Sequence, residues 1–231
     1  LERKPRMKLY SIAIDGPAAS GKSTAAKGVS KALGFLYIDT GARYRAFTLY
    51  RLREKKDTKS REDAISLLPS CHIEEDKEGN TYLNGENVSE QIRTPEVSNQ
   101  VSYACAHLEV REKMVALQRE MAKSQSVVRD GRDIGTVVLP NADLKVYQIA
   151  SAHARAERRY EEFVKKGIPC SRDEILKDIQ RRDYIDSHRE NSPLTKAEDA
   201  IVLDTSDRTI EEETKAILSL FEQKAGIKWK N

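Results

Sequence analysis

One short stretch of the sequence places glycines, a lysine and a hydroxyl residue at the spacing of a phosphate-binding loop. In residues 12–24, Gly16 is followed after four residues by Gly21, Lys22 and Ser23, which fills every fixed position of G-x-x-x-x-G-K-[ST]. The apolar run before the loop is typical of a buried strand, and the Ala/Lys-rich stretch after it is typical of a helix. We therefore expect backbone N–H groups and the helix N-terminus to hold phosphates, Lys22 to reach the β- and γ-phosphates, and Ser23 to contribute to a magnesium site.

A second group of polar residues, DTGARYR from position 39, follows the next predicted strand. In an open parallel sheet, ligands bind at the carboxyl ends of the strands, so these side chains are expected beside the phosphate loop. Thr40 is expected to cap the following helix. Arg45 could present its guanidinium fork to a second phosphate, although a solvent-facing arginine would give the same pattern.

The third predicted strand ends in DGRDIGT at residues 130–136, two acids and an arginine bracketed by glycines. Such residues suit polar ligand recognition better than a core. Asp130 is placed like the acid that assists magnesium at a phosphate site, although an acid that caps a turn would look the same. Arg129, directly before it, argues against full burial of this strand.

Two further clusters of charge fall on predicted helices. In residues 179–190, Arg182, Asp186 and Arg189 have the spacing of one helix face, which is also typical of a solvated charge ladder. The other cluster consists of Arg155, Arg158 and Arg159. Arginines that converge on a transferring phosphoryl group stabilise its negative charge, so together with the loop these clusters indicate a pocket for two phosphorylated ligands.

The elements that must position these residues alternate between strands and helices. Apolar runs at residues 10–14, 35–38, 126–129, 144–149 and 200–203 are separated by long helical stretches. This alternation predicts βαβ units and a parallel sheet covered on both faces. Residues 59–93 interrupt it with a charged helix at 60–68, strands at 71–75 and 81–83, and an Asn84-Gly85 hairpin turn, and we interpret them as an inserted subdomain. Residues 155–171 have the character of a mobile lid.

Composition sets limits on the function. The 231 residues carry 40 Lys+Arg and 37 Asp+Glu, a net charge of only +3, which gives no reason to expect a nucleic-acid or membrane partner. No apolar run approaches the roughly 20 residues of a membrane helix, and the first ten residues contain no signal-peptide core. Cys71, Cys105 and Cys170 match neither a zinc pattern nor a disulfide framework, so we expect a cytoplasmic protein.

The whole pattern resembles the bacterial cytidylate kinases of the nucleoside monophosphate kinase family. The resemblance covers residues 8–221 and rests on five segments in the family's order: IAIDGPAASGKST, YIDTGARYR, IRTPEVSNQVS, DGRDIGTVV and RRDYIDSHRENSPL. It implies an α/β fold of the P-loop NTPase type, with a five-stranded parallel sheet flanked by helices. Residues 59–93 would form an NMP-binding insert and residues 155–171 a lid, which divide the core into 8–58, 94–154 and 172–226.

The implied reaction is transfer of the γ-phosphoryl group of ATP, with magnesium, to CMP or dCMP, giving ADP and the diphosphate. The implied partners are these small nucleotides, with neither nucleic acid nor membrane, and the protein would act as a monomer. Catalysis is assigned to Lys22, Arg132, Arg158, Arg159 and Arg189. ATP binding is assigned to Gly16, Pro17, Ala18, Ala19, Ser20, Gly21, Lys22, Ser23, Thr24 and Arg155. Magnesium binding is assigned to Ser23 and Asp130.

By the same resemblance, CMP binding falls to Thr40, Arg45, Ser102, Arg111, Arg132, Asp133, Arg182, Asp186 and Arg189. Ser102, Arg111 and Asp133 would read the base. Cytosine has an amino donor for the carboxylate and acceptors for the guanidinium, whereas uracil reverses donor and acceptor and would leave buried groups unpaired. Arg182 and Asp186 would hold the ribose hydroxyls, and Arg45, Arg132 and Arg189 the monophosphate.

Two other functions are consistent with the phosphate loop alone. A kinase for AMP, UMP or a non-nucleotide alcohol would share the phosphate loop and lid but lack the base readers. A regulatory GTP-binding switch would need an Asn-Lys-x-Asp motif, which the sequence lacks, and its only D-x-x-G match at residues 76–79 falls in the charged insert.

Overall fold

The structure is a computed structural model that describes residues 8–76, 79–121 and 123–227. Residues 1–6, to which the resemblance assigns no counterpart, lie outside these ranges, as do two residues of the D-x-x-G match. None of the helices in the described part of the chain combines the length and apolar character needed to cross a bilayer.

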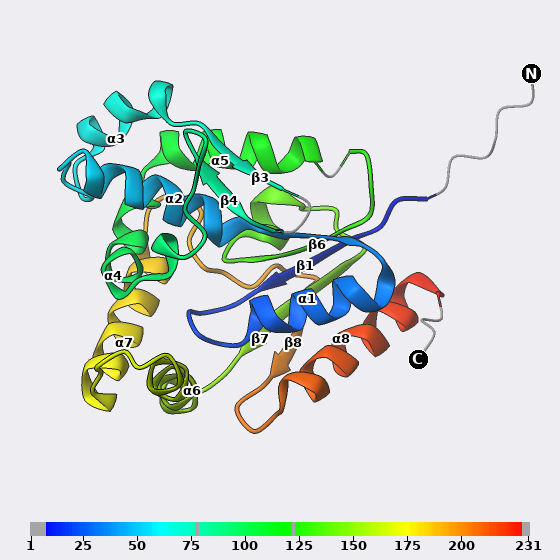
Figure 1. The fold of residues 1–231 in the computed structure, drawn as a ribbon. Coiled ribbons are helices and arrows are strands. Elements are labelled where there is room, and N and C mark those ends of the chain that lie inside the picture. The colour runs from blue at the N-terminus through cyan, green and yellow to red at the C-terminus, as the bar shows by residue number, and fades with distance from the viewer. Residues whose placement is uncertain (1–7, 77–78, 122, 228–231) are drawn as a thin grey trace, which may run out of the picture.

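Five parallel strands form the central sheet, in the order β2-β6-β1-β7-β8 (Figure 1). Their bounds are β1 Ser11–Asp15, β2 Leu36–Asp39, β6 Val127–Gly131, β7 Leu144–Ile149 and β8 Ile201–Asp204. Each overlaps one predicted strand, which confirms the predicted fold. The phosphate loop follows β1, which is the central strand and lies between β6 and β7. The carboxyl ends of β6 and β7 therefore lie on either side of the loop.

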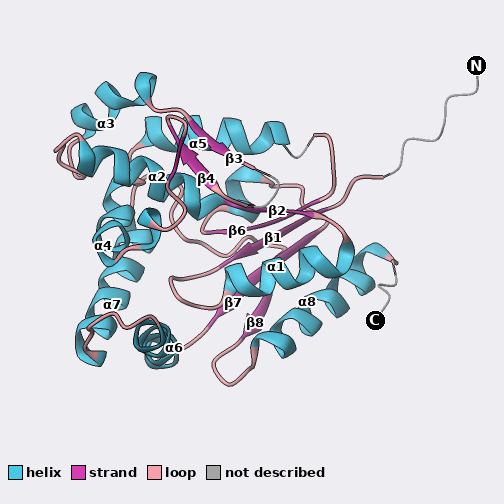
Figure 2. Ribbon diagram, viewed as in Figure 1, coloured by secondary structure: helices cyan, strands magenta, loops and turns pink. Residues whose placement is uncertain are grey.

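Helices cover both faces of the sheet (Figure 2). Helices α1 (Lys22–Leu33) and α8 (Ile210–Ala225) pack on one face, where Ile12 and Ile14 meet Val29 and Phe221. Helix α5 (Leu108–Met121) and the short π-helical turn η3 (Ile134–Val138) lie on the other face with Ala13. Apolar residues point both ways from the central strand because neither face of it meets solvent.

The remaining long helices gather at the carboxyl ends of the strands (Figure 2). They are α2 (Thr40–Arg53), α4 (Pro95–Ala104), α6 (Ala152–Lys165) and α7 (Arg172–His188). Helix α6 covers most of the predicted lid and packs against α7 through Phe163 and Ile179. The predicted bounds of the helix at 179–190 are wrong, because α7 begins earlier and Arg189 follows it in extended conformation.

The predicted insert, residues 59–93, has secondary structure of its own, and its apolar side chains share a core with α2, α4 and α5. It contains α3 (Arg61–Leu67), the 3₁₀ turns η1 (Leu68–Ser70) and η2 (Gln91–Arg93), and the antiparallel strands β3 (Ile73–Glu75), β4 (Thr81–Leu83) and β5 (Glu86–Asn87). Asn84 and Gly85 have φ angles of 49° and 85° between β4 and β5. Two successive positive φ angles are typical of the type I′ hairpin turn, so the hairpin prediction is confirmed.

The expectation that Arg129 prevents full burial of its strand is wrong. Arg129 is among the largest side chains that are completely buried, and its Nη2 donates to the carbonyl oxygen of Gln118. Arg43 is also buried and forms an ion pair of 3.2 Å with Glu75 of the insert. Partners from other elements, α5 for Arg129 and β3 for Arg43, therefore allow these arginines to lie within the fold.

Candidate functional site

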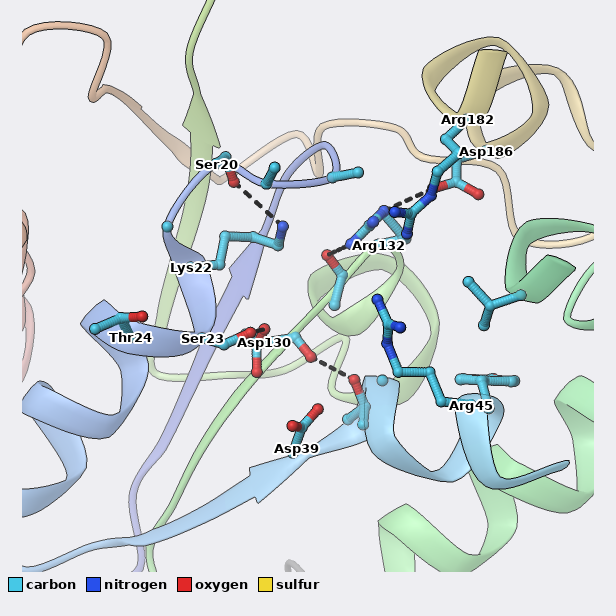
Figure 3. Close-up of a pocket in the computed structure, with 18 of the residues that line it drawn as sticks. Ser20, Lys22, Ser23, Thr24, Asp39, Arg45, Asp130, Arg132, Arg182 and Asp186 are labelled. Atoms are coloured by element: carbon cyan, nitrogen blue, oxygen red, sulfur yellow. Dashed lines mark hydrogen bonds and ion pairs between the residues drawn. The ribbon is translucent and has the colours of Figure 1, made fainter. Parts of the chain in front are cut away.

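A cavity of about 610 Å³ is lined by the segments that follow β1, β2 and β6 (Figure 3). It brings together most of the predicted site residues: Ala18, Ala19, Ser20, Gly21, Lys22, Ser23, Thr24, Thr40, Arg45, Ser102, Arg111, Asp130, Arg132, Asp133, Arg158, Arg159, Arg182, Asp186 and Arg189. Gly16, Pro17 and Arg155 do not line it. The volume lies within the range typical of small-molecule sites.

The glycines of the phosphate loop are required by close contacts behind it. A Cβ atom on Gly16 would lie 2.2 Å from the carbonyl oxygen of Gln148, and one on Gly21 would lie 2.9 Å from Glu213 Oε2. Gly21 also has a φ angle of 89° immediately before α1. The loop can therefore pass between β7 and α8 only with glycine at these positions.

The side chain of Lys22 folds back into the phosphate loop. Its Nζ donates to the carbonyl oxygen of Pro17 at 2.6 Å and to Ser20 Oγ at 3.2 Å (Figure 3). Burial, and next the nearby Arg132 guanidinium, lower the pKa of Lys22 to about 7. An anion in the cavity would favour the charged ammonium, so the loop is suited to a phosphate.

Ser23 and Asp130 meet at the first turn of α1. Ser23 Oγ donates to Asp130 Oδ2 at 2.6 Å, and Tyr37 Oη donates to Asp130 Oδ1 at 2.8 Å. Burial, followed by the Asp39 carboxylate, raises the pKa of Asp130. A hydroxyl and a carboxylate beside a phosphate loop fit Mg²⁺, which uses one or two carboxylates and completes its shell with water and phosphate oxygens. The sequence did not indicate the contribution of Tyr37.

The expected capping role of Thr40 is wrong. Asp39 is the N-cap of α2, and its Oδ1 accepts from the backbone N–H of Ala42 at 3.0 Å. Thr40 is the first residue of the helix, and its hydroxyl donates to the carbonyl oxygen of Asp130. Thr40 therefore links the carboxyl ends of β2 and β6 at the wall of the cavity.

Three arginines from different helices enter the cavity beside α4. Arg45 Nη1 donates to Ser98 Oγ at 2.8 Å, and Arg159 Nη2 donates to the same oxygen at 3.3 Å. Burial and the neighbouring guanidiniums of Arg182 and Arg159 lower the pKa of Arg45. Arg182 is buried, and its Nε has no hydrogen-bond partner among the described residues. Arg159 also pairs with Glu162 at 3.5 Å, whereas Arg45 and Arg182 have no ion pair among the described residues, so this concentration of positive charge indicates an anionic ligand.

Asp186 connects the remaining arginines of this group. Its Oδ2 accepts from Arg132 Nε at 2.8 Å, and its Oδ1 lies 3.9 Å from Arg189 Nη1. Burial works against the charge of Asp186, but Arg132, Arg189 and Arg182 together lower its pKa. The carboxylate thus contacts the guanidiniums of Arg132 and Arg189, which come from two segments, although Arg189 lies beyond the helix on which the sequence placed it.

The far wall of the cavity contains a buried ion pair. Arg111 Nη2 donates to Asp133 Oδ2, and both side chains are at most 5% exposed. Ser102 and Cys105 of the same wall are also buried, and the Arg111 guanidinium lies 5.2 Å from the centre of the Tyr44 ring. These groups offer hydrogen-bond donors and acceptors in a fixed arrangement, which suits recognition of a heterocyclic base.

Arg155 and Arg158 on α6 contact the loop rather than the arginine group. Arg155 Nη1 donates to the carbonyl oxygen of Ala18 at 3.0 Å and pairs with Asp183. Arg158 Nη1 lies 3.5 Å from the carbonyl oxygen of Ser20. Of the three α6 arginines named from the sequence, Arg159 alone therefore joins the group around Ser98.

Asp15, which sequence reasoning did not single out, connects the loop to the base-facing wall. Its two carboxylate oxygens accept from the backbone N–H groups of Ile134 and Gly135 at 2.8 and 2.7 Å. Burial and then the Asp133 charge raise the pKa of Asp15 to about 6, although these hydrogen bonds and Lys22 lower it. Its place at the carboxyl end of the first strand is the sequence feature that could have indicated a role at the site.

We expect Asp15 to make stability depend on pH. Because its folded pKa of about 6 exceeds the ordinary aspartate value of 3.8, the folded protein holds a proton between these pH values that the unfolded chain has lost. The contribution of this group to the free energy of unfolding therefore falls as pH rises from 3.8 to about 6, by up to about 3 kcal/mol. Urea unfolding at pH 4.5 and 7 should show a smaller fall for Asp15→Asn than for wild type. Equal falls would contradict the prediction.

The fold and this cavity define a P-loop kinase. A solved gluconokinase from Sinorhizobium meliloti 1021 shares the fold, with a TM-score of 0.51, 14% identity and coverage of 93% of this chain and 92% of that one. The family model for cytidylate kinase matches residues 12–223.

Two relatives agree with that match. The chain is 50% identical to a cytidylate kinase of Bacillus subtilis (strain 168), over 94% of this chain and 99% of the relative. It is 49% identical to one of Bacillus cereus (strain B4264), over 92% and 96%. The chain belongs to the cytidylate kinase family and is a nucleoside monophosphate kinase.

Proposed function

We propose that this enzyme transfers the γ-phosphoryl group of ATP to CMP and dCMP in a magnesium-dependent reaction in the cytoplasm, as a monomer. The observation that carries the proposal is a single cavity that contains a phosphate loop at one side and the buried Arg111–Asp133 pair at the other. A donor triphosphate and a pyrimidine acceptor would then meet between them. Membership of the cytidylate kinase family supports this choice of acceptor.

The donor occupies the loop. Backbone N–H groups of residues 16–24 and the N-terminus of α1 would surround its phosphates, with the Lys22 ammonium on the β- and γ-phosphates. Arg155 supports this loop from α6 through the carbonyl oxygen of Ala18, so its part in ATP binding is indirect. Ser23 and Asp130 would hold the magnesium ion. When bound, Mg²⁺ supplies positive charge to the phosphate oxygens.

The acceptor occupies the arginine-rich side. Arg45, Arg132 and Arg189 would bind the monophosphate, while Arg182 and Asp186 would hold the ribose hydroxyls. Asp133 would accept from the exocyclic amino group of cytosine, and Arg111 and Ser102 would complete base recognition. The part of Thr40 in CMP binding would be indirect, because its hydroxyl donates to the carbonyl oxygen of Asp130.

The reaction needs no general base. The nucleophile is an oxygen of the monophosphate, already anionic near neutral pH, which attacks the γ-phosphorus. The new O–P bond forms as the bond to the bridging β-oxygen breaks, and ADP leaves. Lys22, Arg132, Arg158, Arg159 and Arg189 would neutralise charge that spreads over the transferring group. Closure of residues 155–171 would exclude water and suppress ATP hydrolysis.

A panel of nucleoside monophosphates tests the proposal. With ATP and magnesium in a coupled assay for ADP, CMP and dCMP should be turned over at a higher kcat/KM than UMP, AMP or dTMP. The reason is that uracil and purine rings would leave buried groups of the base-facing wall unpaired. Efficient turnover of AMP or dTMP without CMP would instead support a kinase for a different acceptor.

A further inference from the structure

A buried carboxylate lies directly behind the phosphate loop, and the proposed reaction gives it no role. Glu213 is in the first turn of α8, and its side chain is completely buried. Its neighbours Glu211 and Glu212 are exposed. An ionised carboxylate is seldom fully buried unless it is paired, so the contacts of Glu213 require an explanation.

One oxygen of Glu213 is connected to the loop backbone. Gln148 Nε2, from β7, donates to Glu213 Oε2 at 3.0 Å and to the carbonyl oxygen of Ser20 at 2.5 Å. The same carboxylate oxygen packs so close to Gly21 that a Cβ atom there would lie 2.9 Å away. Glu213 and Gln148 together therefore support the loop at the two residues that precede Lys22.

The other oxygen faces an arginine that lines the cavity. Glu213 Oε1 makes no hydrogen bond among the described residues and lies 3.5 Å from Arg158 Nη1. The Arg158 guanidinium also donates to the carbonyl oxygens of Thr205 and Arg208. Glu213 is the one charged group among these acceptors, so it contributes the electrostatic part of the attachment. Burial raises the pKa of Glu213 to about 7, while Arg158 opposes this shift.

We propose that Glu213 is a positioning residue that acts through Arg158 and Gln148 to hold the phosphate loop and the α6 guanidinium in the geometry that binds the donor triphosphate. The inference rests on ATP as the donor. Without the negative charge, Arg158 keeps only neutral acceptors and becomes free to leave the cavity wall. The loop then loses one of the contacts that fix the Ser20 carbonyl group, and phosphate binding weakens.

The substitution Glu213→Gln tests the charge without removing the packing. Its side-chain oxygen still accepts from Gln148, whereas the ion pair with Arg158 is lost. We expect a dissociation constant for a non-hydrolysable ATP analogue, measured by calorimetry without acceptor, about tenfold higher than for wild type. In turnover assays, KM for ATP should rise while KM for CMP stays within about twofold. Glu211→Gln, an exposed neutralisation in the same helical turn, is the matched control.

A double-mutant cycle distinguishes positioning from a purely structural role. In an Arg158→Met background the ion pair with Glu213 is already absent, so Glu213→Gln should add little. Full additivity, unchanged analogue binding, or tighter binding by Glu213→Gln would each overturn the inference. If wild type does not bind the analogue, the donor assignment itself fails. If wild type binds the analogue but does not phosphorylate CMP, the acceptor assignment fails. The inference about Glu213 is then still tested by the dissociation constants for the analogue.

Discussion

Replacing Lys22 with methionine is expected to lower kcat by about 10³-fold or more without unfolding the enzyme. Loss of one preorganised charge at a phosphoryl-transfer centre has effects of this order. The Lys22 ammonium is bound by the Pro17 carbonyl group and Ser20 Oγ, so it is held in place before phosphate enters. A coupled assay for ADP at saturating ATP and CMP measures the effect. Lys31→Met, an exposed lysine of the same helix, is the control.

The same substitution should not lower stability in the absence of nucleotide. Burial holds the folded pKa of Lys22 at about 7, below the ordinary lysine value of 10.5, so the folded protein binds fewer protons than the unfolded chain between these pH values. The free energy of unfolding therefore rises with pH between about 7 and 10.5. Below pH 7 the folded protein bears the whole cost of burying the charged ammonium. We expect Lys22→Met to gain most over wild type at pH 6 and least at pH 10 in urea unfolding. A clear loss of stability at pH 6 would contradict this.

Local patterns predicted most of the sheet and the loop. The motif from Gly16 to Ser23 needs only a strand before it and a helix after it, and both are signalled by nearby residues. Asn84-Gly85 predicted its hairpin for the same reason, since a type I′ turn depends on two backbone conformations. Strand ends were correct to within two residues, and this was enough to place Asp130, Arg132 and Asp133 beside the loop.

Contacts between distant segments could not be predicted in this way. Whether Asp39 or Thr40 caps α2 depends on where β2 ends, and the Thr40 hydroxyl is used by a strand some ninety residues later. Arg129 looked unsuitable for burial because its partner, Gln118, belongs to another element. Glu213 resembled its exposed neighbours in an acidic helix start, and only the packing of α8 against the loop distinguishes it.

Replacing Asp133 with alanine is expected to lower kcat/KM for CMP by about 30-fold or more, equivalent to roughly 2–5 kcal/mol of transition-state binding. The carboxylate would lose its hydrogen bond with cytosine. The buried Arg111 would also be left without its charged partner, so stability should fall as well. Asp199→Ala, which removes an exposed carboxylate paired with Lys145 at 2.8 Å, is a control for loss of an ion pair outside the cavity.

Selectivity separates base recognition from the accompanying loss of stability. A weakened fold would lower kcat/KM for CMP and UMP in parallel, because both acceptors need the same folded protein. Loss of a cytosine contact would lower the value for CMP more than that for UMP, since uracil has no amino group for Asp133 to bind. We therefore expect the CMP/UMP ratio to fall by about tenfold or more in Asp133→Ala. An unchanged ratio would assign Asp133 to the support of Arg111 alone.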